Sequence, residues 1–84
     1  MIIDLRTEAE RSRNPRTSDI VINTPLPPLN QSQIADLKVA LTEVARDIPD
    51  RPIKVFCAKG SRSRLATSIL RDMGVEVVDL GGVR

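Results

Sequence analysis

The chain of 84 residues contains no histidine, no tryptophan, no tyrosine and a single cysteine. One cysteine excludes an internal disulfide, so the fold must be held together by packing. The lack of histidine excludes Cys-His and Ser-His dyads and leaves zinc with few of its preferred ligands, so we expect no metal and no cofactor. With one phenylalanine as its sole aromatic residue, the chain also lacks the stacking surface of a single-strand nucleic-acid binder.

Charge and hydrophobicity argue against two further classes, nucleic-acid-binding proteins and membrane proteins. The net charge is +2, with ten arginines against three lysines, which suits small oxyanions better than nucleic acid. No apolar run approaches the roughly 20 residues that cross a bilayer, and no basic-then-apolar leader begins the chain. We therefore expect a single domain over residues 1–84 in the cytoplasm, without a nucleic-acid or membrane partner.

The pattern of apolar residues predicts strands that alternate with helices. Short apolar or β-branched runs predict strands at 1–5, 20–22, 53–56 and 75–78. Helical spacing predicts helices at 8–12, 31–47 and 63–73. Capping boxes begin the first two helices, at Thr7 and Asn30, and Gly74 ends the third in a left-handed cap. This order predicts an α/β fold with a small, mostly parallel sheet and helices on both faces.

Cys57 follows the third predicted strand and precedes the third helix, where the carboxyl edge of a parallel sheet binds ligands. Backbone N–H groups of residues 58–63 can curl into a nest around its sulfur, and the helix N-terminus adds about half a positive charge. Lys59 and Arg62 supply further positive charge, and Gly60 permits the turn. These features predict an activated thiolate; the alternative is an inert, buried thiol that ends a strand.

The loop at Cys57 resembles the active-site loop Cys-x-x-Gly-x-Arg-Ser of single-domain rhodaneses, the thiosulfate sulfurtransferase family. The matching residues are Val55-Phe56-Cys57-Ala58-Lys59-Gly60-Ser61-Arg62-Ser63. Three further segments resemble the family's opening Asp-x-Arg-x-x-x-Glu pattern, its second strand and its closing segment. They are Ile3-Asp4-Leu5-Arg6 with Glu10, Val21-Ile22-Asn23, and Leu70-Arg71-Asp72-Met73-Gly74 through Gly81-Gly82. The resemblance thus covers nearly the whole chain.

This resemblance implies an enzyme, a sulfurtransferase of rhodanese type. Cys57 would take a sulfane sulfur from thiosulfate or a related small anionic donor and hold it as a persulfide. The acceptor would be cyanide, an external thiol or a thioredoxin-like protein. Arg62 and the loop amides would hold the anion, and Asp4 and Arg6 would order the sheet edge rather than react. The substrate-binding residues would be Ala58, Lys59, Gly60, Ser61, Arg62 and Ser63.

Loop length separates activities within the family. The loop from Cys57 to Arg62 has the six residues that accompany sulfur transfer in the family, whereas related phosphatases and arsenate reductases use one more. A small phosphatase or arsenate reductase is therefore a less favoured alternative. A catalytically silent rhodanese-fold module for binding or regulation is the other.

Two features depart from the family's pattern. Residues 14–19 replace the family's His-Ile-Pro-Gly-Ala segment before the second strand, and the sequence stops at Arg84, where family members continue into a further helix. We therefore expect a truncated rhodanese-like fold. Self-association as a homodimer would cover its bare flank.

Overall fold

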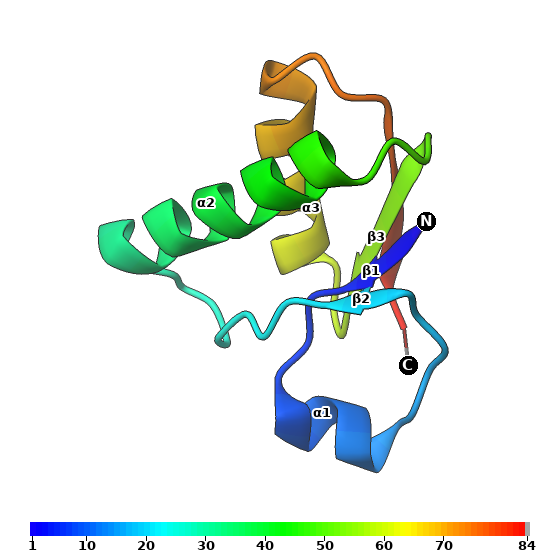
Figure 1. The fold of residues 1–84 in the computed structure, drawn as a ribbon. Coiled ribbons are helices and arrows are strands. Elements are labelled where there is room, and N and C mark those ends of the chain that lie inside the picture. The colour runs from blue at the N-terminus through cyan, green and yellow to red at the C-terminus, as the bar shows by residue number, and fades with distance from the viewer. Residues whose placement is uncertain (84) are drawn as a thin grey trace.

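A computed structural model describes residues 1–83 of the chain and gives strands and helices in strict alternation (Figure 1). Their order is β1 (Ile2–Asp4), α1 (Glu8–Arg13), β2 (Ile20–Val21), α2 (Gln31–Asp47), β3 (Ile53–Cys57), α3 (Ser61–Asp72) and β4 (Val77–Gly82). The four strands form one sheet in the order β2-β1-β3-β4, and every pairing is parallel. The predicted α/β class and parallel sheet are confirmed.

Local side-chain caps fix where the first two helices begin. The Thr7 hydroxyl accepts a hydrogen bond from the Glu10 amide at 3.2 Å, and the Glu10 carboxylate accepts one from the Thr7 amide at 2.9 Å. Asn30 and Gln33 make the same reciprocal pair at the start of α2. Both predicted capping boxes are confirmed, because each depends on residues only three positions apart.

The last strand differs from its prediction. It was expected at 75–78, but β4 runs from Val77 to Gly82 and pairs with β3 along its length. The pairing shifts register between Val55, which faces Asp79, and Phe56, which faces Gly81. The prediction ended the strand at Val78, whereas pairing with β3 extends it through this irregularity to Gly81 and Gly82.

The core lies between the sheet and the two longer helices, which cover the same face of it (Figure 1). Leu37 and Leu41 of α2 are buried against this core, so the apolar stripe of α2 serves packing. The buried cluster consists of Ile3, Leu5, Leu37, Leu41, Ile53, Val55, Cys57, Ala66, Ile69, Leu70 and Val77. Cys57 is therefore both the end of the central strand β3 and a member of the core.

The prediction of helices on both faces of the sheet is wrong for the described residues, because α2 and α3 cover the same face and the opposite face receives less cover (Figure 1). Lys54 and Val78 are partners in register, so they share a face, and both are exposed. The short helix α1 has no buried residue and lies beyond the carboxyl ends of the strands (Figure 1). Within residues 1–83, no helix combines the length and the apolar character that crossing a membrane requires.

Candidate active site at the β3–α3 loop

Cys57 lies where the chain leaves the sheet for α3. The run Ile53–Cys57 forms β3, which is flanked by β1 and β4, so the cysteine is held from both sides. Its backbone carbonyl accepts a hydrogen bond from the Val83 amide at 2.9 Å. The Cys57 side chain has no exposed surface. The predicted position at the carboxyl edge of the sheet is thus correct, and the thiol lies beneath the loop.

Two backbone amides of the loop donate hydrogen bonds to the Cys57 sulfur. The Gly60 N–H lies 3.0 Å from Sγ and the Ser63 N–H lies 3.4 Å from it. Burial raises the pKa of the Cys57 thiol, but hydrogen bonds from Ser63, Gly60 and Arg62 outweigh burial and leave this pKa below its ordinary value. The loop amides therefore favour the thiolate form of Cys57 without an imidazole, and the catalytic activation of this thiol stays a prediction.

Gly60 gives the loop its shape. Its φ of +102° lies in the left-handed region, where a residue with a Cβ would be strained, and it caps the N-terminus of α3. The Gly60 carbonyl accepts hydrogen bonds from the Arg64 amide at 3.1 Å and from the Ser63 hydroxyl at 3.0 Å. The hydrogen bond from the Ser63 hydroxyl thus stabilises the turn of the loop at Gly60.

Gly82 of β4 packs closely against the loop backbone at Ala58 and Lys59. A Cβ at this position would lie 2.7 Å from the Ala58 carbonyl oxygen and 2.8 Å from the Lys59 Cα. Only a residue without a side chain fits so close to the loop backbone. Sequence reasoning did not assign Gly82 to the site, because this contact joins residues far apart in the chain. In the sequence, only the pair Gly81-Gly82 hinted that the backbone of β4 approaches another segment closely at this point.

Arg62 has different partners from those expected. Its two terminal nitrogens bind the Glu10 carboxylate, at 2.7 Å to Oε1 and 2.8 Å to Oε2, and Nη1 also donates to the Thr24 carbonyl at 3.1 Å. The Arg62 side chain is almost fully buried, and its Nε has no hydrogen-bond partner among the described residues. The Arg62 head group therefore ties the loop to α1 and to the segment after β2, and its charge is balanced by Glu10.

Glu10 joins the site through this ion pair, although the sequence suggested it only as part of the opening motif. The Arg62 guanidinium lowers the pKa of Glu10 from 4.5 to about 2, against a smaller opposing effect of burial. The carboxylate is therefore ionised at neutral pH and makes a bidentate pair with Arg62. It also completes the capping box of α1, so one side chain links that helix to the loop.

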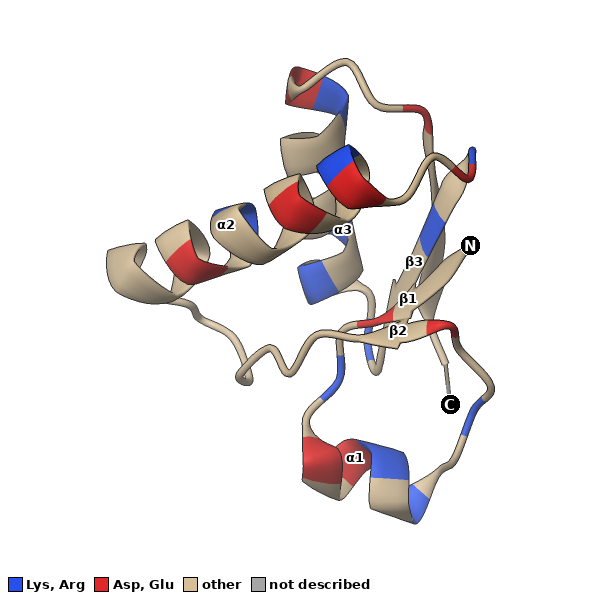
Figure 2. Ribbon diagram, viewed as in Figure 1, with Lys and Arg blue, Asp and Glu red and all other residues tan. Residues whose placement is uncertain are grey.

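Asp4 and Arg6 form a second, fully buried ion pair, with Nη2 of Arg6 3.0 Å from Oδ2 of Asp4. The Arg6 guanidinium also donates to the Asn14 carbonyl at 2.7 Å and lies 5.2 Å from the centre of the Phe56 ring. Charged segments after β1 and β3 and in α1 gather at this end of the sheet (Figure 2). These contacts agree with the expected ordering role of Asp4 and Arg6.

Of the remaining loop residues, Lys59 and Ser61 line a pocket and Ala58 does not. Lys59 and Ser61 are exposed, whereas Ala58 is partly buried. The pocket has a volume of about 210 Å³ and is lined by Glu10, Leu26, Pro27, Lys59, Ser61 and Arg62. We call it the loop pocket. Cys57 is not among its lining residues, although Lys59, Ser61 and Arg62 of the same loop are.

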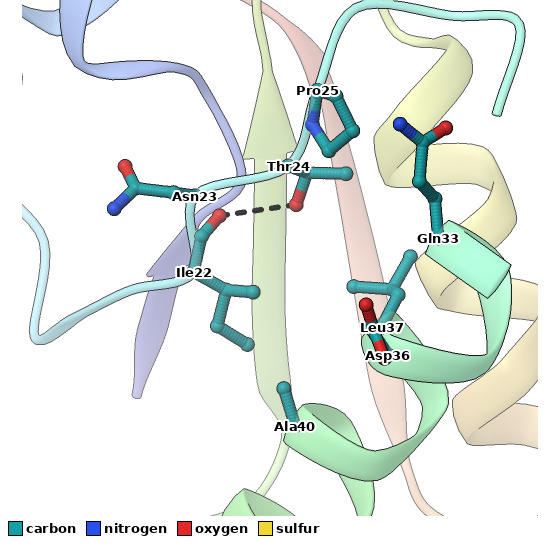
Figure 3. Close-up of a pocket in the computed structure, with 8 residues that line it drawn as sticks. All are labelled: Ile22, Asn23, Thr24, Pro25, Gln33, Asp36, Leu37 and Ala40. Atoms are coloured by element: carbon teal, nitrogen blue, oxygen red, sulfur yellow. Dashed lines mark hydrogen bonds between the residues drawn. The ribbon is translucent and has the colours of Figure 1, made fainter.

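A second pocket of about 210 Å³ lies between the segment after β2 and α2 (Figure 3). Residues Ile22, Asn23, Thr24 and Pro25 form one side of it, and residues Gln33, Asp36, Leu37 and Ala40 of α2 form the other (Figure 3). The Thr24 hydroxyl donates to the Ile22 carbonyl at 3.0 Å. Because the Thr24 carbonyl accepts from Arg62, this pocket shares a wall residue with the network that anchors the loop.

The described residues contain no group of three or more acidic, histidine or cysteine side chains that could hold a metal ion. The chemistry that residues 57–63 offer is that of a cysteine sulfur that accepts hydrogen bonds from two loop amides, those of Gly60 and Ser63, which we call the amide ring. Such donors favour an anionic sulfur.

Comparisons with known proteins identify no relative. No protein-family model matches the chain, and neither a curated protein nor a solved structure matches it. The rhodanese resemblance therefore stays a prediction from the sequence.

Proposed function

We propose that this protein is a sulfurtransferase that carries a sulfane sulfur as a persulfide on Cys57. The donor is thiosulfate or a related small anion, and the acceptor is cyanide or an external thiol, including that of a thioredoxin-like protein. The observation that supports this most is the pair of amide donors from Gly60 and Ser63 to the Cys57 sulfur. A lone reduced cysteine suits the cytoplasm, so we propose that compartment.

The reaction needs no group beyond the thiolate and its amide ring. The Cys57 thiolate attacks the outer sulfur of thiosulfate, a new S–S bond forms, and sulfite leaves with the electron pair of the broken bond. Cyanide or a thiolate then attacks the terminal sulfur of the persulfide, and Cys57 is released as a thiolate. The loop amides stabilise the negative sulfur before and after each transfer.

Substrate must reach a thiol that has no exposed surface. Arg62 is anchored by Glu10 and Thr24, whereas Lys59 and Ser61 lie exposed on the outer side of the loop. Arg62 is thus the fixed end of the loop. We propose that segment 58–61 shifts outward to admit the donor, a movement that breaks the Gly60 hydrogen bond to the sulfur and parts the loop from Gly82.

The same burial favours one alternative, a catalytically silent module that binds a partner through the rhodanese-like fold. In that case the amide ring would only fill the space around an inert thiol, as buried cysteines usually do. A phosphatase or arsenate reductase is less favoured, because the loop is one residue shorter than the loops of those enzymes.

Mass spectrometry of the intact protein separates these functions. After incubation with thiosulfate, the wild-type chain should gain one sulfur atom, and Cys57→Ser should gain none. With thiosulfate and cyanide together, the wild type should form thiocyanate. If the wild type neither gains sulfur nor forms thiocyanate, the silent module is the better account. Release of phosphate from an aryl phosphate would instead support the phosphatase.

A further inference from the structure

The loop pocket carries an excess of positive charge next to the sulfur site. Its charged side chains are Lys59, Arg62 and Glu10, so the lining has one more positive than negative group. Glu10 is already bound to both terminal nitrogens of Arg62. The Lys59 ammonium group, in contrast, has no ion pair among the described residues, and its side chain is exposed. The pocket is therefore suited to an anionic group.

A buried donor without a partner strengthens this assignment. Nε of Arg62 makes no hydrogen bond in the described part of the chain, although the Arg62 side chain is only 2% exposed. A buried donor without an acceptor is unfavourable by about 1–3 kcal/mol, so native structures usually supply a partner. Because Arg62 lines the loop pocket, an anionic oxygen bound there is the candidate partner of this donor, provided that the outward shift of segment 58–61 uncovers Nε.

The apolar part of the loop pocket's lining consists of Leu26 and Pro27, and Leu26 is 63% exposed. The volume of about 210 Å³ is larger than cyanide needs, yet it lies below the roughly 300–1,000 Å³ of sites for drug-sized ligands. A ligand with a short hydrocarbon stem and one charged end matches both the size and the walls.

We propose that the loop pocket binds the acceptor of the sulfur, and that this acceptor is a small organic thiol bearing a carboxylate. This inference rests on the proposed function. The carboxylate lies against Lys59 and Arg62, and the hydrocarbon stem lies against Leu26 and Pro27. When segment 58–61 shifts, the acceptor thiolate attacks the outer sulfur of the persulfide. The S–S bond breaks, its electron pair returns to the Cys57 sulfur, and the acceptor leaves as a persulfide.

The test isolates the acceptor step from loading. Protein loaded with thiosulfate is desalted and mixed with 3-mercaptopropionate or 2-mercaptoethanol, and intact mass spectrometry follows the loss of the persulfide. The ratio of the two rate constants is the carboxylate preference. The intrinsic reactivities of the thiols cancel when this ratio is compared between wild type and a variant.

Lys59→Met should lower the carboxylate preference about two- to fivefold, the range expected for an exposed ion pair. Lys38→Met, which removes an exposed lysine on α2, should leave the preference unchanged. Leu26→Ser should slow transfer to both thiols. Its control is Val39→Ser, because Val39 is similarly exposed, at 59%, and lies outside the loop pocket.

The outcomes separate this inference from the proposed function. A persulfide that forms normally while Lys59→Met keeps the wild-type preference would overturn the acceptor site and leave the sulfurtransferase intact. Equal effects of Leu26→Ser and Val39→Ser would overturn the apolar wall of the site. Failure of the wild type to gain sulfur would remove both proposals.

Discussion

The ion pair between Glu10 and Arg62 should make the stability of this protein depend on acid. The pKa of Glu10 is about 2 in the folded chain, against an ordinary value of 4.5, because the Arg62 guanidinium favours the ionised carboxylate. The unfolded chain therefore binds this proton more tightly than the folded chain. Stability from this pair is fully present above pH 4.5 and is lost as the pH falls toward about 2.

The size of the effect follows from the pKa difference. At 1.36 kcal/mol per pKa unit, lowering the pKa from 4.5 to about 2 corresponds to roughly 3 kcal/mol at neutral pH. The Glu10 side chain is 11% exposed, so solvent screens the pair little. A domain of 84 residues has a total unfolding free energy of about 4–13 kcal/mol. This single pair is thus a large part of the stability.

Glu10→Gln tests this reasoning, because the amide keeps a hydrogen-bond acceptor but cannot ionise. Urea unfolding should be followed by far-ultraviolet circular dichroism, since the chain has no tryptophan for fluorescence. At pH 7 the variant should unfold with a free energy lower by about 3 kcal/mol. The difference from wild type should shrink as the pH falls from 4.5 toward 2.

Glu8→Gln is the matched control, because Glu8 lies in the same first turn of α1 and is exposed. This variant should keep the acid dependence of the wild type. The reasoning would be refuted if Glu10→Gln were as stable as wild type at pH 7, or if the two lost stability in parallel below pH 4.5.

Three further predictions concern the loop and the sheet. Gly82→Ala would place a methyl group 2.7 Å from the Ala58 carbonyl oxygen, so persulfide formation from thiosulfate should slow; loading at the wild-type rate would contradict this contact. The lowered pKa of Cys57 should move the midpoint of its pH-dependent alkylation by iodoacetamide below that of a cysteine in a short peptide, and an equal or higher midpoint would argue against the amide ring. Val78 and Leu80 are 40% and 46% exposed on the edge strand β4, so we expect a homodimer in analytical ultracentrifugation, and a monomer at high concentration would exclude it.

Sequence reasoning succeeded where the determining residues are close in the chain. The bounds of α2 agree with the prediction because Asn30 and Gln33 cap it locally and its apolar residues recur at helical spacing. The step from β3 through Cys57 to a helix was predictable for the same reason. The third helix begins at Ser61 rather than at residue 63, because Gly60 caps it in a left-handed conformation that the sequence pattern did not reveal.

Only the tertiary structure decided which distant segments of the chain are in contact. The terminal nitrogens of Arg62 bind Glu10, 52 residues earlier, because folding brings α1 beside the loop. That Arg62 also holds a substrate anion stays a prediction. The contact of Gly82 with the loop depends on the pairing of β4 with β3. By itself the sequence determined an α/β chain with one cysteine before a loop of amide donors. Only the packed fold decided that this thiol is buried, that the arginine is an anchor, and that a separate pocket lies beside them.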